Sequence, residues 1–309
     1  MGFVATFNAA GDTPIASLEL GGVKKGVDGK LVAHIQAGPD PDLGEQGPAV
    51  AVLNGVIDKL VVEQSGPVRA VLKATGKYSG GGHAAFLPFT ARFYIAAGST
   101  SIRIVHYFAY DGDINKDFIK ALGITWSTPL TDELYNRHVR FGSSDGGLFG
   151  ESVLGLYGLR RDATDRVLNP QFAGEPLPDI STWPATIVAG YKDLPTWSDW
   201  SLDQQGSERF TIRKRTDKGS KVIWLNAGEG WRSAGTGFVG GATAGGVGWG
   251  LKEAWQRATT GADVRGTTGS AAQVTVWAYS PRAPALDLRH YDTVPHGVRL
   301  ALWASKQSN

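Results

Sequence analysis

Two short segments each combine a fixed cation, an imidazole and a phenol. Residues 134–141 read LYNRHVRF, and residues 286–292 read LDLRHYD. Arginine binds a carboxylate in bidentate geometry, and histidine titrates near neutral pH. Together they can hold an acid group and remove a proton beside it. These residue types therefore suit the chemistry of an acidic sugar.

The geometry of a strand decides which of these side chains can act together. On a strand, His138 and Arg140 would share one face, because successive side chains point to opposite sides. In the second segment Arg289 and Tyr291 would share a face. The alternative is that the arginines hydrogen-bond strand ends or internal carboxylates, such as those of Asp287 and Asp292.

The chain has ten tryptophans, which divide into candidate core and candidate binding residues. Trp224 and Trp277 lie near or within alternating apolar segments and suit a core. Trp197 and Trp200 lie in the polar stretch TWSDWS, where an exposed indole could pack against a sugar ring. For these two residues the core interpretation has equal weight.

The composition excludes several classes of site. The 309 residues include no cysteine, which removes disulfides, thiol nucleophiles and thiolate metal sites. The 31 Lys and Arg residues nearly balance 29 Asp and Glu residues and form no basic block, so no nucleic-acid partner is expected. No apolar run is long enough to cross a bilayer, so no membrane partner is expected either.

Period-two alternation recurs along most of the chain and predicts antiparallel strands. The clearest strands are predicted for residues 68–76, 90–95, 101–108, 210–215 and 273–279. Helical signals are few, with a turn or two expected in 113–122, a strand and short helix in 247–255, and a helix in 297–304. The fold class expected is all-β, a large antiparallel β-sandwich with few short helices.

We expect one domain over residues 1–309, with residues 1–60 as a candidate partial β layer at the N-terminus. Pro, Trp and Asp gather between Asn169 and Trp200, which predicts a long surface excursion that carries a binding function or covers a cleft.

Two familiar patterns have simpler explanations here. Residues 235–240, GTGFVG, match a dinucleotide fingerprint, but their surroundings are antiparallel in pattern, so glycines at bulges and turns explain them better. Asp111 and Asp113 open a calcium-loop-like string, yet Lys116 stands where an EF-hand needs glycine. Turn capping is favoured, with a weak alternative of Ca²⁺ near these two residues, and no other cofactor or metal is expected.

Five strings, in their order and spacing, resemble the rhamnogalacturonan exolyase-like proteins, a polysaccharide lyase group. They are GPVRA (66–70), LPFTARF (87–93), HYFAYDGD (106–113), YNRHVRF (135–141) and SPRAPALDLRHYD (280–292). The resemblance implies the central sandwich of such proteins, of the galactose-mutarotase-like super-sandwich type. It also implies an N-terminal β domain and a C-terminal α/α toroid in the family. The toroid is absent from this chain, and half of an active cleft would be absent with it.

The leading hypothesis is a polysaccharide lyase, or its sandwich module, that cleaves a uronate polymer such as rhamnogalacturonan or ulvan by β-elimination. The candidate catalytic residues are Arg137, His138, Arg289, His290 and Tyr291. The candidate substrate-binding residues are Tyr110, Tyr135, Arg140, Trp197 and Trp200. This hypothesis requires the arginines of both segments to converge in one groove. The expected partner is an acidic polysaccharide, and the expected location is secreted or periplasmic, with the signal peptide not present in this chain.

Two alternatives stay open. The chain could be a non-catalytic carbohydrate-binding sandwich, which would bind sugar through Trp197 or Trp200 without needing the histidines. It could also be a glycoside hydrolase or epimerase on a mutarotase-like fold, for which Glu151, Glu208, Glu229 and Glu253 supply carboxylates without a distinguishing spacing.

Overall fold

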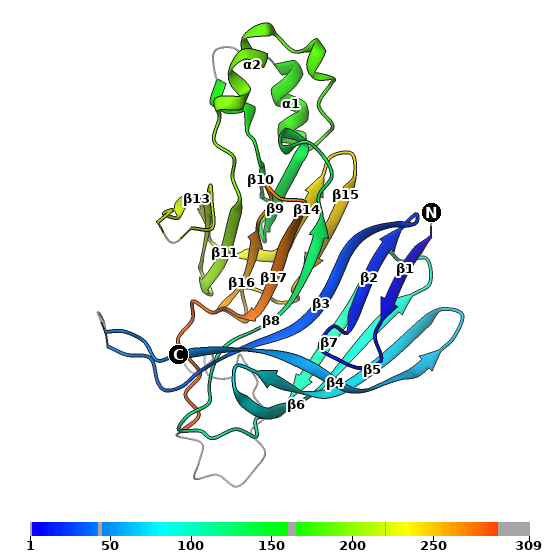
Figure 1. The fold of residues 1–309 in the computed structure, drawn as a ribbon, viewed down its shortest axis with the longest axis vertical. Helices are drawn as coiled ribbons and strands as arrows, with labels where there is room; N and C mark the ends of the chain where they lie inside the picture. Colours follow the sequence, from blue (N-terminus) through cyan, green and yellow to red (C-terminus); the bar gives the residue numbers. More distant parts are fainter. Residues whose placement is uncertain (1, 43–44, 160–164, 220, 290–309) are drawn as a thin grey trace. The chain divides into compact units, whose positions relative to one another are not determined.

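The computed structural model of the chain describes residues 2–42, 45–159, 165–219 and 221–289. Strands dominate it, and where their pairing is recorded they run antiparallel, so the predicted all-β sandwich class is confirmed (Figure 1). The chain divides into two compact units, one of residues 1–126 and 277–309 and one of residues 127–276. We call them unit 1 and unit 2. No helix among the described residues is long and apolar enough to cross a membrane.

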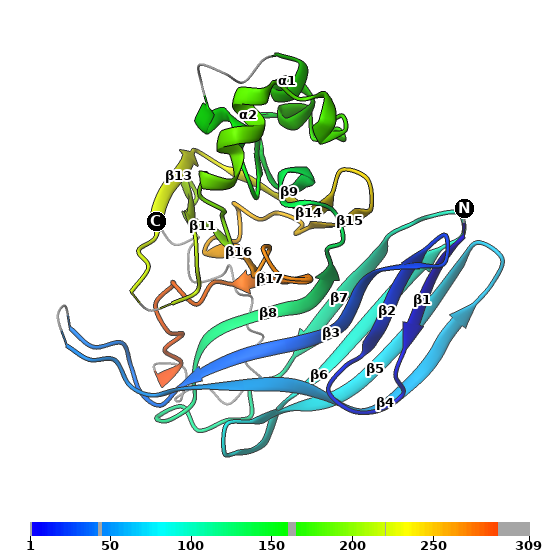
Figure 2. The ribbon, with the colours of Figure 1, turned by 45° about the horizontal axis from the view of Figure 1, so that its top comes forward.

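Unit 1 is a sheet in the order β8-β3-β4-β5-β6-β7, with β1 and β2 added beside β3 (Figure 2). Its strands are β1 (Phe3–Phe7), β2 (Ile15–Leu20), β3 (Val23–Gln36), β4 (Val50–Ser65), β5 (Arg69–Gly80), β6 (His83–Ala96), β7 (Ile102–Phe108) and β8 (Phe118–Pro129). Residue 60, where the sequence placed the end of a first β layer, lies inside β4. Alternate residues of these strands form one apolar core, which includes Leu53, Tyr78 and Phe93.

Unit 2 contains two sheets. The first has the order β13-β12-β11-β16-β17, and the second has the order β10-β9-β14-β15. The strands are β9 (Arg137–Ser143), β10 (Leu148–Ser152), β11 (Asp199–Gly206), β12 (Arg209–Arg215), β13 (Leu225–Gly230), β14 (Ser233–Gly241), β15 (Gly245–Gly250), β16 (Thr260–Arg265) and β17 (Ala271–Tyr279). Leu202 and Ala262 of the first sheet line one cavity with Phe141 and Trp249 of the second, which makes the pair a sandwich.

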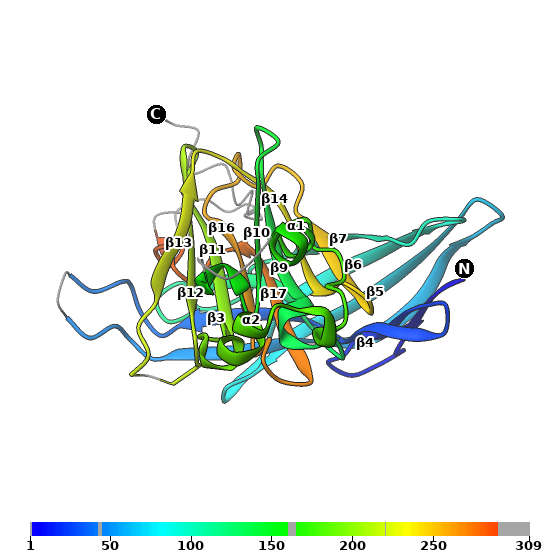
Figure 3. The ribbon, with the colours of Figure 1, turned by 90° about the horizontal axis from the view of Figure 1, so that it is seen from above.

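The segment between β10 and β11 is helical, where the sequence predicted only a surface excursion. It contains η2 (Leu156–Leu159), α1 (Asp165–Ala173), η3 (Ile180–Thr182), α2 (Ala185–Gly190) and η4 (Tyr191–Asp193). It has its own apolar cluster around Leu156, Trp183 and Ile187. Figures 1 and 3 show α1 and α2 next to β9 and β10. The sequence did not predict these helices, because α1 contains Pro170, a residue that disfavours a helix interior, and because α2 has only six residues.

The other local predictions are confirmed for the strands and differ from the structure for the helices. The five predicted strands all lie within β5, β6, β7, β12 and β17, apart from residues at their ends. Residues 113–122 form a turn followed by β8, and residues 247–255 form the end of β15 followed by turns. The glycines of residues 235–240 lie in β14, where Gly235 has a φ of 73° at a register shift. The bulge interpretation is confirmed. Residues 297–304 lie outside the described residues.

The close pairing of β4 and β5 generates a test of stability. A Cβ atom at Gly76 would lie 1.9 Å from the carbonyl oxygen of Val56. We expect Gly76→Ala to lower the free energy of unfolding by about 3 kcal/mol, because the backbone of β4 would have to move. Urea denaturation measures it. Gly206→Ala is the control, since nothing lies within 4 Å of its Cβ position. Equal stability of the two variants would contradict the packing argument.

Candidate functional site

Arg137, at the start of β9, is held by main-chain oxygens. Its Nε donates to the carbonyl of Asp132 at 2.6 Å, and its Nη1 donates to the carbonyls of Thr267 at 2.8 Å and Gly269 at 2.6 Å. These contacts are of the kind that the structural alternative predicted. The guanidinium fastens the loop after β16 to the start of β9 through Nε and Nη1.

His138 and Arg140 share one face of β9, as strand geometry predicted. Cross-strand partners place His138 opposite Ser152 and Gly240, and Arg140 opposite Gly150 and Phe238. Arg140 donates through Nη2 to the carbonyl of Ala173 at the end of α1. This contact ties the helical segment to the sheet.

His138 is buried, with 3% of its surface exposed, and its Nε2 has no hydrogen-bond partner. Burial, and then the nearby Arg140, lower the pKa of His138 to about 4 against the opposing effect of Asp132. The imidazole is therefore neutral at pH 7. As placed, its buried Nε2 cannot touch a substrate.

The second segment belongs to unit 1. Arg289 donates to both carboxylate oxygens of Asp287, at 2.9 and 2.6 Å, and its guanidinium lies 5.4 Å from the ring centroid of Phe118. Nearly half of both side chains is exposed, at 46% and 42%. His290 and Tyr291 lie outside the described residues. The convergence of the two segments in one groove stays a prediction.

Both tyrosines predicted to bind substrate have internal contacts. The ring of Tyr135, which precedes β9, lies 4.9 Å from that of Trp183 and 6.5 Å from that of Tyr191. Both of these partners belong to the helical segment. In unit 1, the hydroxyl of Tyr110 donates to the carbonyl of Asp117 at 3.0 Å. Burial raises the pKa of each phenol.

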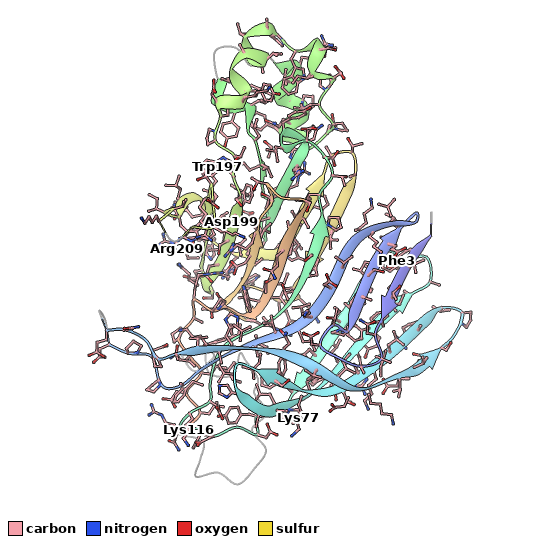
Figure 4. All side chains as sticks on the ribbon, viewed as in Figure 1. Phe3, Lys77, Lys116, Trp197, Asp199 and Arg209 are labelled. Carbon is pink, nitrogen blue, oxygen red and sulfur yellow. The ribbon has the colours of Figure 1, made fainter. Side chains whose placement is uncertain are left out.

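The tryptophans depart from the sequence interpretation in two places. Trp200 is fully buried, so the expectation of an exposed indole is wrong for this residue: on β11 it points into the sandwich. Trp277 is 5% exposed and confirms its predicted place in a core, whereas Trp224 is only partly buried and lies among arginines. Trp197 is also partly buried, and Figure 4 shows it just before Asp199.

Trp197 belongs to a group that we call the lysine cluster, made of Glu151, Tyr157, Trp197 and Lys214. The carboxylate of Glu151 accepts hydrogen bonds from Tyr157 and Lys214 through one oxygen, and from Trp200 Nε1 at 3.4 Å through the other. Lys214 Nζ lies 3.9 Å from the ring centroid of Trp197. The side chains of Lys214 and Glu151 are only 13% and 10% exposed. A nearly buried, fully paired charge of this kind holds a fixed geometry.

The hydroxyl of Tyr157 donates to Glu151 within the lysine cluster. Burial, and then the hydrogen bond to Glu151, raise the pKa of this phenol. Lys214 Nζ also donates to its oxygen at 3.4 Å. The phenol therefore keeps its proton at neutral pH.

The opposite face of the same strand ends carries a second group, the arginine cluster, made of Asp199, Arg215, Trp224 and Arg265. Asp199 is opposite Arg215 in the sheet and accepts from its Nε at 2.8 Å. The guanidinium carbons of Arg215 and Arg265 lie 4.5 and 4.7 Å from the ring centroid of Trp224. Arg265 also pairs with Asp263 at 2.9 Å. Such stacking fixes the planes of both guanidinium groups.

Arg213, two residues before Arg215 on β12, is exposed on the same face. It forms no hydrogen bond or ion pair with the part of the chain that the structure describes. Since Arg215 and Arg265 are each matched by an aspartate, Arg213 supplies the uncompensated positive charge beside the arginine cluster.

Turn capping is confirmed for one of the two acidic residues near the candidate calcium loop. Asp113 caps a turn by accepting from the backbone N–H of Asn115 at 2.9 Å, whereas Asp111 accepts from the backbone N–H of Leu87 in β6 at 2.6 Å. Within residues 2–42, 45–159, 165–219 and 221–289, no group of three or more His, Asp or Glu side chains is arranged to hold a metal.

Comparison with known proteins identifies the family of this chain. The sequence profile of the PcRGLX-like protein central beta sandwich domain matches residues 2–299. The chain belongs to that family. It is 30% identical over 299 residues to "Uncharacterized protein YetA" of Bacillus subtilis (strain 168), an alignment that covers 95% of this chain and 34% of that protein. The chain thus spans about a third of the length of this relative, and it corresponds to a sandwich module related to polysaccharide lyases.

Sequence reasoning found only part of the two clusters. Glu151 and Trp197 were candidates, but Tyr157, Lys214, Arg215 and Arg265 were not. The alternation of residues 210–215 placed Lys214 and Arg215 on opposite faces, and this is the one signal that could have found them. Their partners, Glu151 on β10 and Asp199 on β11, lie 63 and 16 residues away along the chain, and one sequence does not reveal such pairings.

Removing the lysine of the buried pair tests the lysine cluster. Lys214→Met leaves the Glu151 carboxylate buried without its cation, and we expect the free energy of unfolding to fall by about 3–5 kcal/mol. The double variant Glu151→Gln/Lys214→Met removes both charges, so it should recover much of that loss in urea denaturation. A double variant less stable than Lys214→Met would contradict the pairing.

The buried imidazole gives a pH test. The unfolded chain binds a proton at His138 near its ordinary pKa of 6.5, whereas the folded chain does so only near 4. Stability due to neutral His138 is thus present above pH 6.5 and is lost as the pH falls toward 4. His138→Gln should reduce this loss by roughly 2–3 kcal/mol. Denaturation curves at several pH values measure the slope, and an unchanged slope would contradict the assignment.

Proposed function

We propose that this chain is the sandwich module of a polysaccharide lyase and that it acts on a uronate-containing polysaccharide, such as rhamnogalacturonan or ulvan. The observation that carries the proposal is the gathering of cations and aromatic rings at one end of β11, β12 and β16. There the lysine cluster and the arginine cluster lie on opposite faces of the same strand ends. Family membership supports the same class of protein.

The arginine cluster and Arg213 supply the recognition of a sugar acid. Arg213 is exposed and unmatched by a carboxylate among the described residues, so it can pair with a uronate. The partly buried ring of Trp224 offers apolar area against the C–H face of a sugar. The fixed guanidinium planes of Arg215 and Arg265 orient this ring.

β-Elimination then needs a base and an acid. Neutralising the uronate makes the C5 proton acidic, a base removes it, the C4–O bond breaks, and a C4=C5 double bond forms. The leaving glycosidic oxygen takes up a proton from the acid. His290 and Tyr291 keep their predicted roles as base and acid, and Arg289 keeps its predicted role at the carboxylate. Secretion or export to the periplasm is proposed with this function, since the substrate is an extracellular polymer.

A non-catalytic carbohydrate-binding module is the second candidate. It is favoured by the internal use of the first segment, in which Nε and Nη1 of Arg137 donate to carbonyls and the Nε2 of His138 is buried. In this case the clusters would bind sugar without proton transfer.

One assay separates the two candidates. The chain is mixed with rhamnogalacturonan, ulvan, alginate and glucuronan, and ultraviolet absorbance of the unsaturated uronate is followed beside calorimetric binding. We expect new absorbance on one polymer. Arg213→Gln should raise KM about tenfold, because it removes the cation proposed to pair with the uronate.

Lys218→Gln is the matched control, because Lys218 is exposed in the same unit and lies outside both clusters. Binding without absorbance on any polymer would favour the non-catalytic module. Saturated products would indicate a hydrolase, and the absence of both binding and turnover would contradict the proposal.

A further inference from the structure

Unit 1 has a sheet face on which cations and tyrosines gather. Cross-strand partners place Lys73 beside Arg92 and Tyr94 beside Arg103, on β5, β6 and β7. Residues directly opposite each other in a sheet share a face. Figure 2 shows the three strands side by side, and Figure 4 marks Lys77 on β5. We call this surface the basic face, made of Arg69, Lys73, Lys77, Arg92, Tyr94, Arg103 and Tyr107.

The basic face is the outer side of the sheet. The intervening residues Leu72, Phe93 and Ile104 pair with one another across the same strands and belong to the apolar core. Since successive side chains alternate, the charged residues point away from that core. Arg103 is exposed, and Tyr107 is 60% exposed.

Five cations on this face meet two carboxylates. Arg92 donates to both oxygens of Glu63, at 2.6 and 2.9 Å, and holds the pKa of Glu63 below its usual value. Lys77 lies 3.4 Å from Asp111. Within the described residues, Arg69, Lys73 and Arg103 form no ion pair, so the face has excess positive charge.

The uncompensated cations are combined with flat rings. The guanidinium carbons of Arg69 and Arg103 lie 5.8 and 5.6 Å from the ring centroid of Tyr94. Tyr107 presents its ring to solvent. Rings of this kind bury the apolar face of a sugar while the cations meet its acid groups.

The spacing of the cations indicates a ligand with many charges. Arg69, Lys73 and Lys77 recur every fourth residue of β5, which places them about 14 Å apart along the strand. A single small anion could contact only one of them. An extended chain with acid groups at intervals could contact all three.

We propose that the basic face binds a linear acidic polysaccharide and forms a binding surface separate from the clusters of unit 2. The inference rests on the proposed function for the identity of the ligand as a uronate polymer. It adds a place where the polymer is held without being cleaved.

The experiment compares a double charge reversal on the basic face with a control charge reversal elsewhere in the intact chain. Binding of polygalacturonate is measured by calorimetry for Lys73→Glu/Arg103→Glu and for a control, Lys24→Glu, which reverses an exposed cation on β3 of the same unit. We expect the double variant to bind at least about tenfold more weakly and the control to bind like the parent chain. Tyr107→Ala should also weaken binding, and Tyr107→Phe should not.

The outcomes separate this inference from the proposed function. Thermal unfolding verifies that each variant is folded, and turnover of a short uronate oligosaccharide reports on the proposed catalytic residues, none of which belongs to the basic face. Weaker polymer binding with unchanged oligosaccharide turnover supports the basic face. If the chain shows no turnover at all but the double variant still loses polymer binding, the proposed lyase fails and the basic face stands. Unchanged polymer binding in the double variant, or equally tight binding of DNA or polyglutamate to the parent chain, would overturn it.

Discussion

The Glu151–Lys214 pair is the contact on which the arrangement of unit 2 depends. Two charges with so little exposure are stable only when each has its partner and its hydrogen bonds. Through one carboxylate the pair joins β10, η2 and β12, and it fixes the phenol of Tyr157 and the indole of Trp200. Because adjacent residues of a strand face opposite ways, fixing Lys214 also fixes Arg215 on the other face. Both clusters therefore follow from the position of one strand end.

Much of the fold could be predicted because alternation is a local property. The alternation within residues 68–76 and 210–215 predicts which side chains are buried. Strands β5 and β12 form where this alternation occurs. The helical segment could not be predicted in this way. Its short helices depend on packing around Trp183 and on the buried amide of Gln171, which bonds the backbone of Leu154 and Leu156. Neither contact leaves a periodic signal in the sequence.

The candidate site could be predicted from the sequence less well than the fold. Residue types at 137 and 138 suggested a cation and a base, but the sequence does not show which carbonyl oxygens a folded backbone will present to an arginine. Arg137 meets three of them, and His138 is buried, with 3% of its surface exposed. Conversely, Lys214 was not a candidate, since its carboxylate partner lies 63 residues away along the chain. Long-range pairing, rather than residue type, decides which charges are available.

The division of the chain has a consequence for its synthesis. Unit 2 is inserted in unit 1, whose core includes Tyr279 and Ala283 beside residues from β3 to β8. These two residues leave the ribosome only after the whole of unit 2 has been made. The apolar interior of unit 1 is therefore incomplete while some 150 residues emerge, whereas unit 2 is continuous in sequence and can close first. The order of folding runs from the inserted unit to the one that surrounds it in the chain.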